Sequence, residues 1–334
     1  MRKLILFTIS IIGIFLFHSC DDETSKPTFP ISAEIFYSID GKQVAFTALT
    51  HSAVSWSWDF GDGNTSTDKD PVYVYTDGGY YIAKLTATDK AGNTATSEVN
   101  LAVALTPYAL LTGDHTQPGY DGKTWKMSQG HSSNDKLVNS DAELTLFDEG
   151  IQSLPTGAFD LYLGLKEAYN DEYTFYFDGS FKHNTIDGSS FGGIVYAMIM
   201  QQLGLTTITK TGGEAVFGQD AFALTTYTPE NNATFILTES EAYSVPTIPA
   251  FATGVDSNGI PIVTYSNVMT IDFPNSSEFI AARDFFPKVM VEEITDNSMR
   301  LVVFLTMSPD AVLNINPLIV LSTTALILTF EVVN

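Results

Sequence analysis

Alternating apolar and polar residues predict β-strands along much of the chain. Between residues 54 and 60 every second residue is apolar, and the run ends at Gly61-Asp62-Gly63-Asn64, a sequence typical of a tight turn. The alternation recurs over residues 81–88 and 99–103, with Ala91-Gly92-Asn93 predicting a turn between them. We therefore expect a sheet-forming N-terminal region. Its inward-facing side chains would be Val54, Trp56, Trp58, Phe60, Tyr81, Ala83, Leu85, Ala87, Val99, Leu101 and Val103.

The rest of the chain has the same strand pattern. Hairpins are predicted over residues 173–181 and 290–305, and residues 326–332 alternate as a terminal strand. Residues 194–203 and 278–286 are the two stretches that could form short helices. Thr, Ser, Val, Ile and Tyr are plentiful, which also favours strands. We therefore expect an all-β protein, in which a first sandwich is followed by a second β-sandwich or β-barrel domain.

The first residues predict export. Arg2 and Lys3 precede an apolar run from Leu4 to Phe17, which is too short to span a membrane comfortably and has the length of a signal-peptide core. Leu16-Phe17-His18-Ser19-Cys20 resembles a lipobox, although its second and third residues depart from the usual pattern. Cys20 is the only cysteine, so it is the predicted lipidation site and no intramolecular disulfide can form. An ordinary signal peptide with a chance cysteine is the alternative.

The residues that follow Cys20 bear on location. Asp21-Asp22-Glu23 resembles the acidic signal that directs Bacteroidetes lipoproteins to the cell surface, and a solvated acidic linker is the alternative. We expect a signal peptide at residues 1–19 and an acidic, proline-containing tether at residues 20–29. The protein would then be lipid-anchored in the outer membrane and face the cell exterior.

Residues 30–104 carry the motif of a known domain family. Trp58-Asp59-Phe60-Gly61-Asp62-Gly63 resembles the signature of PKD domains, named after the polycystic kidney disease protein. The resemblance implies an immunoglobulin-like β-sandwich of two sheets, which in such proteins usually serves as a spacer. We expect the tryptophan to fill the core and the two aspartates to hold the turn, with a binding or metal site as the alternative.

Residues 105–334 are expected to form the domain that carries function. Leu110-Leu111-Thr112-Gly113-Asp114, followed by Gly122-Lys123-Thr124-Trp125-Lys126-Met127, resembles the opening of C-terminal domains in Bacteroidetes surface lipoproteins of glycan-utilisation systems. Weaker islands of the same resemblance lie at residues 172–181 and 291–301. The resemblance implies a β domain that binds a polysaccharide, with an outer-membrane glycan transporter as a further partner.

Charge narrows the class of ligand. The chain has a net charge of −23, which should repel nucleic acid and anionic lipid surfaces. Neutral polysaccharides are therefore better candidate ligands than uronate-containing or sulfated ones. Net charge does not exclude a local basic pocket.

Catalytic and metal-binding motifs are weak. Gly188-Ser189-Ser190-Phe191-Gly192 fits the nucleophile-elbow pattern, but no histidine follows it, whereas hydrolases of that fold order their triad Ser, acid, His. His115 and His131 lack the spacing and partners of metal ligands, so we expect them in surface loops. Asp256-Ser257-Asn258-Gly259 resembles the start of a calcium loop, but a plain turn is favoured because the remaining ligands are missing. The sequence therefore predicts neither an enzyme nor a metal or cofactor site.

The leading interpretation is a non-catalytic cell-surface lipoprotein that binds a neutral polysaccharide for uptake. Sugar rings dock their C–H faces on aromatic side chains, and polar side chains at the rim meet their hydroxyls. A structural or adhesive surface protein that binds another protein is the second hypothesis, and a polysaccharide hydrolase is the third. The sequence does not name the glycan, the binding face or the oligomeric state. The candidate platform residues are Trp125, Tyr120, Tyr162, Tyr169 and Phe159, with a core position as the alternative for Trp125.

Overall fold

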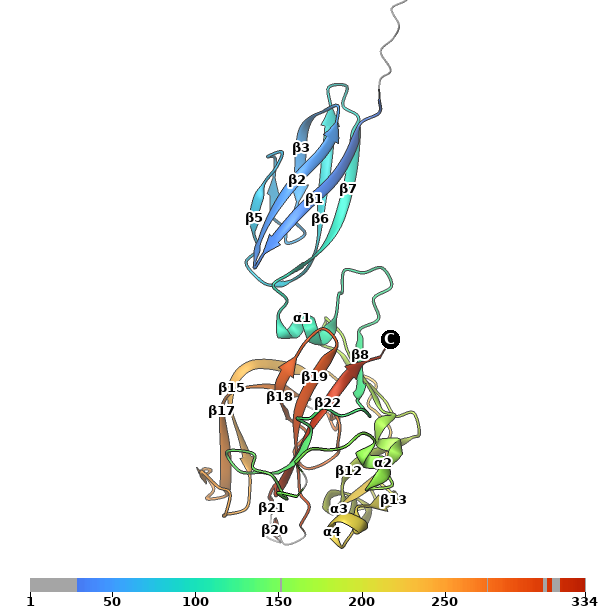
Figure 1. Cartoon of the computed structure of the whole chain (residues 1–334), viewed down its shortest axis with the longest axis vertical. Helices are drawn as coiled ribbons and strands as arrows, with labels where there is room; N and C mark the ends of the chain where they lie inside the picture. Colours follow the sequence, from blue (N-terminus) through green and yellow to red (C-terminus); the bar gives the residue numbers. More distant parts are fainter. Residues whose placement is uncertain (1–28, 151, 275, 309–310, 314–318, 334) are drawn as a thin grey trace, which may run out of the picture. The chain divides into compact units, whose positions relative to one another are not determined.

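The structure is a computed structural model that describes residues 29–150, 152–274, 276–308, 311–313 and 319–333 (Figure 1). The predicted signal peptide, Cys20 and the acidic tether up to residue 28 lie outside the described residues. The chain divides into two compact units, and the second contains all of residues 100–334. Within the described residues, none of the helices is long and apolar enough to cross a lipid bilayer.

The N-terminal strands form two sheets, as the alternation predicts. One sheet has the order β1-β2-β5 and the other the order β4-β3-β6-β7. This is the immunoglobulin-like sandwich expected from the sequence. The strands are β1 (Ser32–Asp40), β2 (Gln43–His51), β3 (Ala53–Asp59), β4 (Thr65–Ser66), β5 (Val72–Val74), β6 (Gly79–Asp89) and β7 (Thr94–Val103).

The core of the sandwich lies between these sheets, around Trp58. The Trp58 side chain is fully buried, packs 5.1 Å from the ring of Phe46, and donates from Nε1 to the carbonyl oxygen of Asp68. Val54, predicted to face inward, is instead 48% exposed. The pairing of β3 with β6 shifts between Ala53 and Ser55, and such an irregularity turns the side chain at the shift away from the regular alternation.

The second unit is also built of sheets. Its large sheet has the order β11-β10-β8-β22-β19-β18-β17-β15, with β16 paired to β17 and β9 paired to β22. A small sheet has the order β12-β14-β13, and β20 pairs with β21. The strands of the large sheet are β8 (Lys123–Met127), β9 (Lys136–Asn139), β10 (Glu172–Phe175), β11 (Phe181–Asn184), β15 (Ile236–Pro246), β16 (Gly254–Val255), β17 (Pro261–Asp272), β18 (Val289–Ile294), β19 (Ser298–Leu305) and β22 (Thr324–Val332).

Short helices and the smaller strands complete the second unit. The helices are α1 (Pro107–Thr112), α2 (Ala158–Leu161), the 3-10 helix η1 (Lys166–Tyr169), α3 (Ile194–Gln202) and α4 (Glu214–Phe217). The remaining strands are β12 (Ser189–Gly193), β13 (Ile208–Gly212), β14 (Phe222–Thr226), β20 (Val312–Leu313) and β21 (Ile319–Val320).

Local predictions for the second unit hold at four places and fail at one. The hairpins β10–β11 and β18–β19, the helix α3 and the terminal strand β22 are confirmed. The helix expected over residues 278–286 is wrong, because the backbone of that segment pairs with the small sheet. Arg283 bridges Gly192 in parallel, and its N–H donates to the carbonyl oxygen of Phe191 (2.8 Å).

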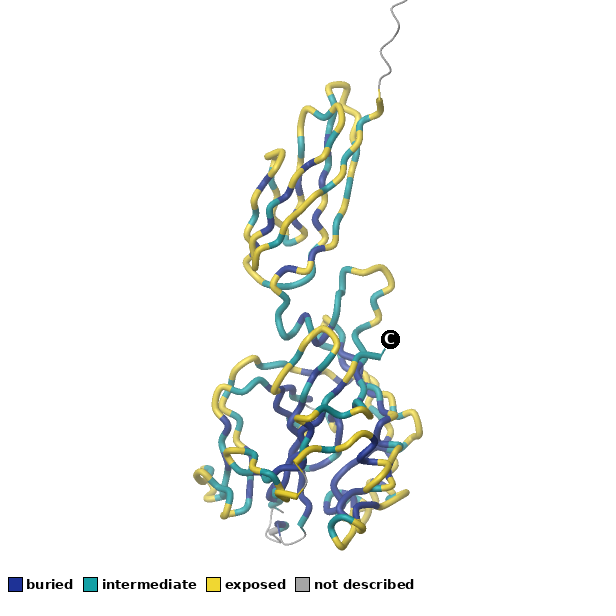
Figure 2. Tube along the Cα trace, in the orientation of Figure 1, coloured by how far each residue is buried: buried dark blue, intermediate teal, exposed yellow. Residues whose placement is uncertain are grey.

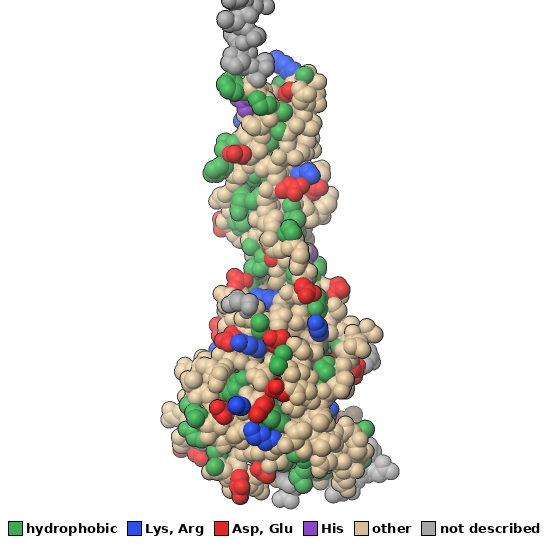
Figure 3. Space-filling model, turned by 90° about the vertical axis from the view of Figure 1, so that its right-hand side faces the viewer, with side chains coloured by type: hydrophobic (Ala, Val, Ile, Leu, Met, Phe, Trp, Pro, Cys, Tyr) green, Lys and Arg blue, Asp and Glu red, His purple; other side chains and the backbone are tan. Residues whose placement is uncertain are grey.

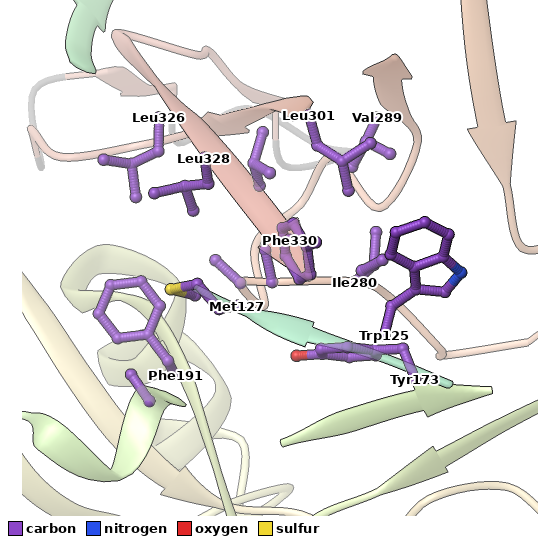
Figure 4. Packing of buried hydrophobic residues seen from close by; sticks show 14 of the residues in the cluster. Trp125, Met127, Tyr173, Phe191, Ile280, Val289, Leu301, Leu326, Leu328 and Phe330 are labelled. Carbon is purple, nitrogen blue, oxygen red and sulfur yellow. The ribbon is translucent and has the colours of Figure 1, made fainter. Parts of the chain in front are cut away.

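Both faces of β22 are covered over residues 324–328, which explains its long apolar run. Leu326, Leu328 and Phe330 pack on one face, in the cluster shown in Figure 4. Ala325 and Ile327 belong to a separate cluster of buried residues. A strand buried on both faces has a nearly continuous apolar sequence, unlike one with a solvated face. Figure 2 shows the buried residues of the second unit concentrated along these central strands.

Candidate functional site

Trp125 is a core residue and offers no platform to a ligand. Its side chain is fully buried on β8, beside Tyr173 of β10 (Figure 4). Its Nε1 donates to the carbonyl oxygen of Leu111 at 2.9 Å, and Lys123 Nζ lies 4.7 Å from its ring centroid. The interpretation of Trp125 as a platform residue is therefore wrong, and the alternative, a core position, is correct. Residues 110–113 and 123–125 contact each other through this bond and through Lys123.

Phe159 and Tyr169 are also buried, so the same correction applies to them. The Phe159 ring stacks on Tyr169 (centroids 5.3 Å apart) and on Phe191 (4.9 Å). The Tyr169 hydroxyl accepts from the Phe159 N–H and lies 2.7 Å from Nε2 of His131. Burial raises the pKa of Tyr169 to about 12. Both rings hold α2 and η1 against the core.

His131 is not the exposed loop residue expected from the sequence. Its side chain is buried, and Nδ1 lies 2.8 Å from a carboxylate oxygen of Asp135. The same carboxylate accepts from the backbone N–H of Thr329, on β22. His131 therefore belongs to a buried network that includes Tyr169 and attaches its loop to the large sheet.

Tyr120 is half-buried, and its hydroxyl forms two hydrogen bonds within the protein. The hydroxyl donates to the carbonyl oxygen of Thr112 (2.9 Å) and accepts from the N–H of Phe177 (2.8 Å). His115 stacks on Phe177 with centroids 3.6 Å apart. Tyr120 therefore ties α1 to the β10–β11 turn, and only part of its ring faces solvent.

Tyr162 is the one predicted platform residue that is exposed, at 52% of its surface. It follows α2 and lines a cavity of about 480 Å³, which we call the α2 cleft. The described residues that line the cleft are mostly apolar, with Glu149, Gln152 and Ser153 as the polar groups. The others are Leu137, Gly150, Leu154, Pro155, Ala158, Phe159, Leu163, Val216, Phe217, Phe222 and Leu326.

A buried polar cluster missed by the sequence analysis surrounds His183. Its Nδ1 lies 3.1 Å from Glu278 and its Nε2 lies 3.4 Å from Asp171. Burial by itself would lower the pKa of His183, but hydrogen bonds to both carboxylates outweigh that effect and raise it. No motif marks this cluster, because its members come from three separate parts of the sequence.

The nucleophile-elbow pattern does not form an elbow. Ser190 lies within the strand β12 rather than at its turn, and its side chain is almost fully buried. An elbow requires an exposed hydroxyl at a sharp turn between strand and helix. Among the described residues, no three His, Cys, Asp or Glu side chains are grouped so that they could hold a metal ion.

The aspartates in the turns at residues 59–64 and 256–260 accept hydrogen bonds from backbone N–H groups, as expected if their role is structural. Asp59 Oδ1 accepts from the N–H of Gly61 (2.9 Å), and Asp62 Oδ1 accepts from the N–H of Asn64 (3.0 Å). Asp256 Oδ1 likewise accepts from the N–H of Asn258 and of Ile260. These segments are turns closed by their own carboxylates.

Charge on the second unit is mixed. In the face shown in Figure 3, acidic side chains lie beside lysines and arginines. Arg300, for example, contacts both Glu292 and Glu293. This face of the second unit therefore lacks the continuous basic stripe that nucleic-acid binding would require.

Comparison with known proteins identifies the N-terminal sandwich. The sequence profile of the PKD domain matches residues 36–103, which confirms the resemblance based on the Trp58–Gly63 motif. The pre-pro-metalloprotease PrtV of Vibrio cholerae is 46% identical over 57 residues, which are 17% of this chain and 6% of that protein. Because the match covers only 6% of PrtV, it gives no reason to assign the protease activity of PrtV to this chain.

Solved structures also resemble parts of the chain, and two of them are as follows. The PKD1 domain of Vibrio cholerae PrtV is 31% identical, with a TM-score of 0.23 over 23% of this chain and 100% of that one. A structure of carbohydrate-binding modules from the β-sandwich superfamily covers 92% of this chain and 93% of that one, at 14% identity and a TM-score of 0.24. Neither score is high enough to support a functional argument.

Proposed function

We propose that this protein is a non-catalytic lipoprotein of the bacterial cell surface that binds a polysaccharide at the α2 cleft. The PKD domain serves as the spacer, and the second unit carries the ligand. Cys20 attaches the chain to the outer membrane, where an outer-membrane glycan transporter is its partner in uptake. The observation that carries the binding site is the exposed ring of Tyr162 at an open, largely apolar cavity.

The chemistry of the cleft suits a sugar chain. The Tyr162 ring offers an apolar face to the C–H face of a sugar, and its hydroxyl stays available at the rim. Gln152, Ser153 and Glu149 supply donors and acceptors for hydroxyl groups beside that face. A neutral glycan is favoured because Glu149 would repel an anionic one at this position.

Binding is tested by electrophoresis of the purified protein through native gels that contain neutral polysaccharides. We expect one or more of them to retard the protein, and Tyr162→Ala to abolish the retardation. Tyr37→Ala is the matched control, because Tyr37 is 43% exposed but lies on β1 of the PKD domain. Retardation that survives Tyr162→Ala, or that is lost equally in both variants, would contradict the proposed site.

The same samples separate the alternative functions. A non-catalytic binder releases no reducing sugar on prolonged incubation with the polysaccharide that retards it, whereas a hydrolase does. An adhesive protein ignores every soluble glycan and instead retains a protein partner. The anchor is tested separately with Cys20→Ser, which should move the protein from the membrane fraction to the soluble exported fraction.

A further inference from the structure

Arg283 is an arginine without an acidic partner. The chain contains three arginines, of which Arg283 and Arg300 lie in the described residues. Arg300 is held by Glu292 (2.7 Å) and Glu293 (3.0 Å), whereas none of the described carboxylates forms an ion pair with Arg283. In a chain with a net charge of −23, such a guanidinium is unexpected.

The hydrogen bonds of Arg283 within the protein are few and long. Nη1 lies 3.4 Å from the hydroxyl of Thr225 and 3.4 Å from the carbonyl oxygen of Thr226, close to the limit for a hydrogen bond. Nε is buried and has no partner. The guanidinium therefore keeps unused donors, although it is half-buried.

The nearest acids along the chain are engaged elsewhere. Glu278 contacts His183 through Oε2 and accepts the N–H of Glu230 through Oε1. Asp284 is buried, and its two oxygens accept from the backbone N–H groups of Phe285 (2.8 Å) and Thr306 (3.1 Å). Neither carboxylate is placed to neutralise Arg283 as an ion pair.

Three aromatic rings surround the guanidinium instead. Its central carbon lies 4.3 Å from the ring centroid of Tyr227, 5.4 Å from that of Tyr196 and 5.8 Å from that of Phe279. Aromatic rings stabilise a nearby cation without accepting hydrogen bonds in the plane of its N–H groups. The rings therefore leave the remaining guanidinium donors without a partner among the described residues.

The backbone holds Arg283 in place. Its N–H donates to the carbonyl oxygen of Phe191 (2.8 Å), and its own carbonyl oxygen accepts from the N–H of Gly193 (3.2 Å). A Cβ at Gly192 would lie 2.4 Å from that oxygen. The backbone segments around Gly192 and Arg283 therefore approach more closely than a side chain at residue 192 would allow. Because the backbone is fixed in this way, only the side-chain rotamers of Arg283 lose conformational entropy when a ligand binds.

We propose that Arg283 forms a binding site for a carboxylate-bearing sugar. A carboxylate has two oxygens in one plane and matches the paired N–H groups of a guanidinium. Tyr196, half-buried beside the guanidinium, would contact the sugar through the part of its ring that stays exposed, and the Thr225 hydroxyl would add a polar contact. The site is independent of the α2 cleft, because none of its residues lines that cavity.

The test uses the full-length protein with ¹⁵N-labelled arginine. With three arginines in the chain, the Nε–H signals are few and can be assigned with Arg283→Lys and Arg300→Lys. Sodium D-galacturonate is titrated in, and D-galactose, which has the same ring stereochemistry without the carboxylate, serves as the uncharged match. We expect galacturonate to shift the Arg283 signal saturably, galactose to leave it in place, and the Arg300 signal to stay unchanged.

The outcomes separate this site from the proposed function. An Arg283 signal that ignores galacturonate, or that moves equally with galactose, overturns the carboxylate site. A saturable shift that persists in Tyr162→Ala supports it even if no neutral polysaccharide binds the protein. The decisive measurement is made on the unsubstituted chain, so it stands even if Arg283→Lys folds poorly.

Discussion

The indole Nε1 of Trp125 donates to the carbonyl oxygen of Leu111 across 2.9 Å, and both residues are fully buried. The bond joins α1 to β8, two elements separated by a loop that contains three glycines and one proline. Lys123 strengthens the same connection, because its Nζ donates to the carbonyl oxygen of Leu110. Residues 110–113 and 123–125, on which the predicted resemblance to surface lipoproteins depends, therefore contact each other inside the protein.

Trp125→Phe should weaken this contact between α1 and β8. The change removes the donor, leaves the Leu111 carbonyl buried without its partner and creates a cavity, which together cost about 2–4 kcal/mol of stability. Urea unfolding followed by circular dichroism measures the loss. Tyr162→Ala, at an exposed ring, should change stability by less than about 0.5 kcal/mol. Equal effects of the two changes would contradict the core assignment of Trp125.

Gly193→Ala should destabilise the second unit. A Cβ at this position would lie 2.4 Å from Oδ2 of Asp284, which is buried and held by the N–H of Thr306. Because that carboxylate has little room to move, we expect a loss of about 1–3 kcal/mol in urea unfolding. The control is Gly254→Ala, where no atom lies within 4 Å, and it should change stability by less than about 0.5 kcal/mol.

Stability should fall as the pH rises above 6.5 because of His183. Its pKa is raised from 6.5, so the folded protein binds the proton more tightly than the unfolded chain. The stabilisation from its contacts with Asp171 and Glu278 is complete below pH 6.5 and is lost as the pH rises through the folded value. For one proton the slope is at most about 1.4 kcal/mol per pH unit.

Urea midpoints measured between about pH 4 and pH 9 check the role of His183, which should appear above pH 6.5. His183→Gln should flatten the decline above pH 6.5. The buried Asp284, whose pKa burial raises to about 7, gives a decline between pH 3.8 and about pH 7 in both proteins, so it serves as an internal reference. An unchanged slope above pH 7 in His183→Gln would show that His183 does not hold the proton.

Asp62→Ala should loosen the turn of the PKD motif only slightly. The change removes the hydrogen bonds that Asp62 accepts from the backbone N–H and from the side-chain amide of Asn64, which at this exposed turn contribute about 0.5–1.5 kcal/mol. If the turn is purely structural, calcium and a chelator should leave thermal unfolding of both proteins unchanged. A melting temperature that rises with calcium only in the unsubstituted protein would instead indicate a metal site.

Short-range features could be predicted from the sequence. The hairpins β10–β11 and β18–β19 follow from alternation and turn residues, and α3 follows from an apolar stretch without strand alternation. The Trp58 motif gave the fold of the first sandwich. In each case residues close in the chain determine the structure, so the pattern is readable locally.

Features set by distant parts of the chain could not be predicted. Residues 278–286 have the composition of a helix, yet bonds to Phe191 and Gly193 make the segment an edge of the small sheet. The burial of Trp125 depends on its contact with α1. Arg283 lacks an acidic partner because Glu278 and Asp284 form hydrogen bonds with other groups. An alternating pattern shows which side chains of a strand are apolar. It does not show whether another element of the structure covers them.

The position of β22 has a consequence for when the second unit can fold. This strand joins β19 to β8 and β9, and its Val332 pairs with Trp125, roughly 200 residues earlier in the chain. Until residues 324–332 have emerged from the ribosome, β8 and β19 lack their shared neighbour. The second unit of the nascent chain should therefore remain unfolded until late in synthesis, with the edges of β8 and β19 open to pairing with other strands.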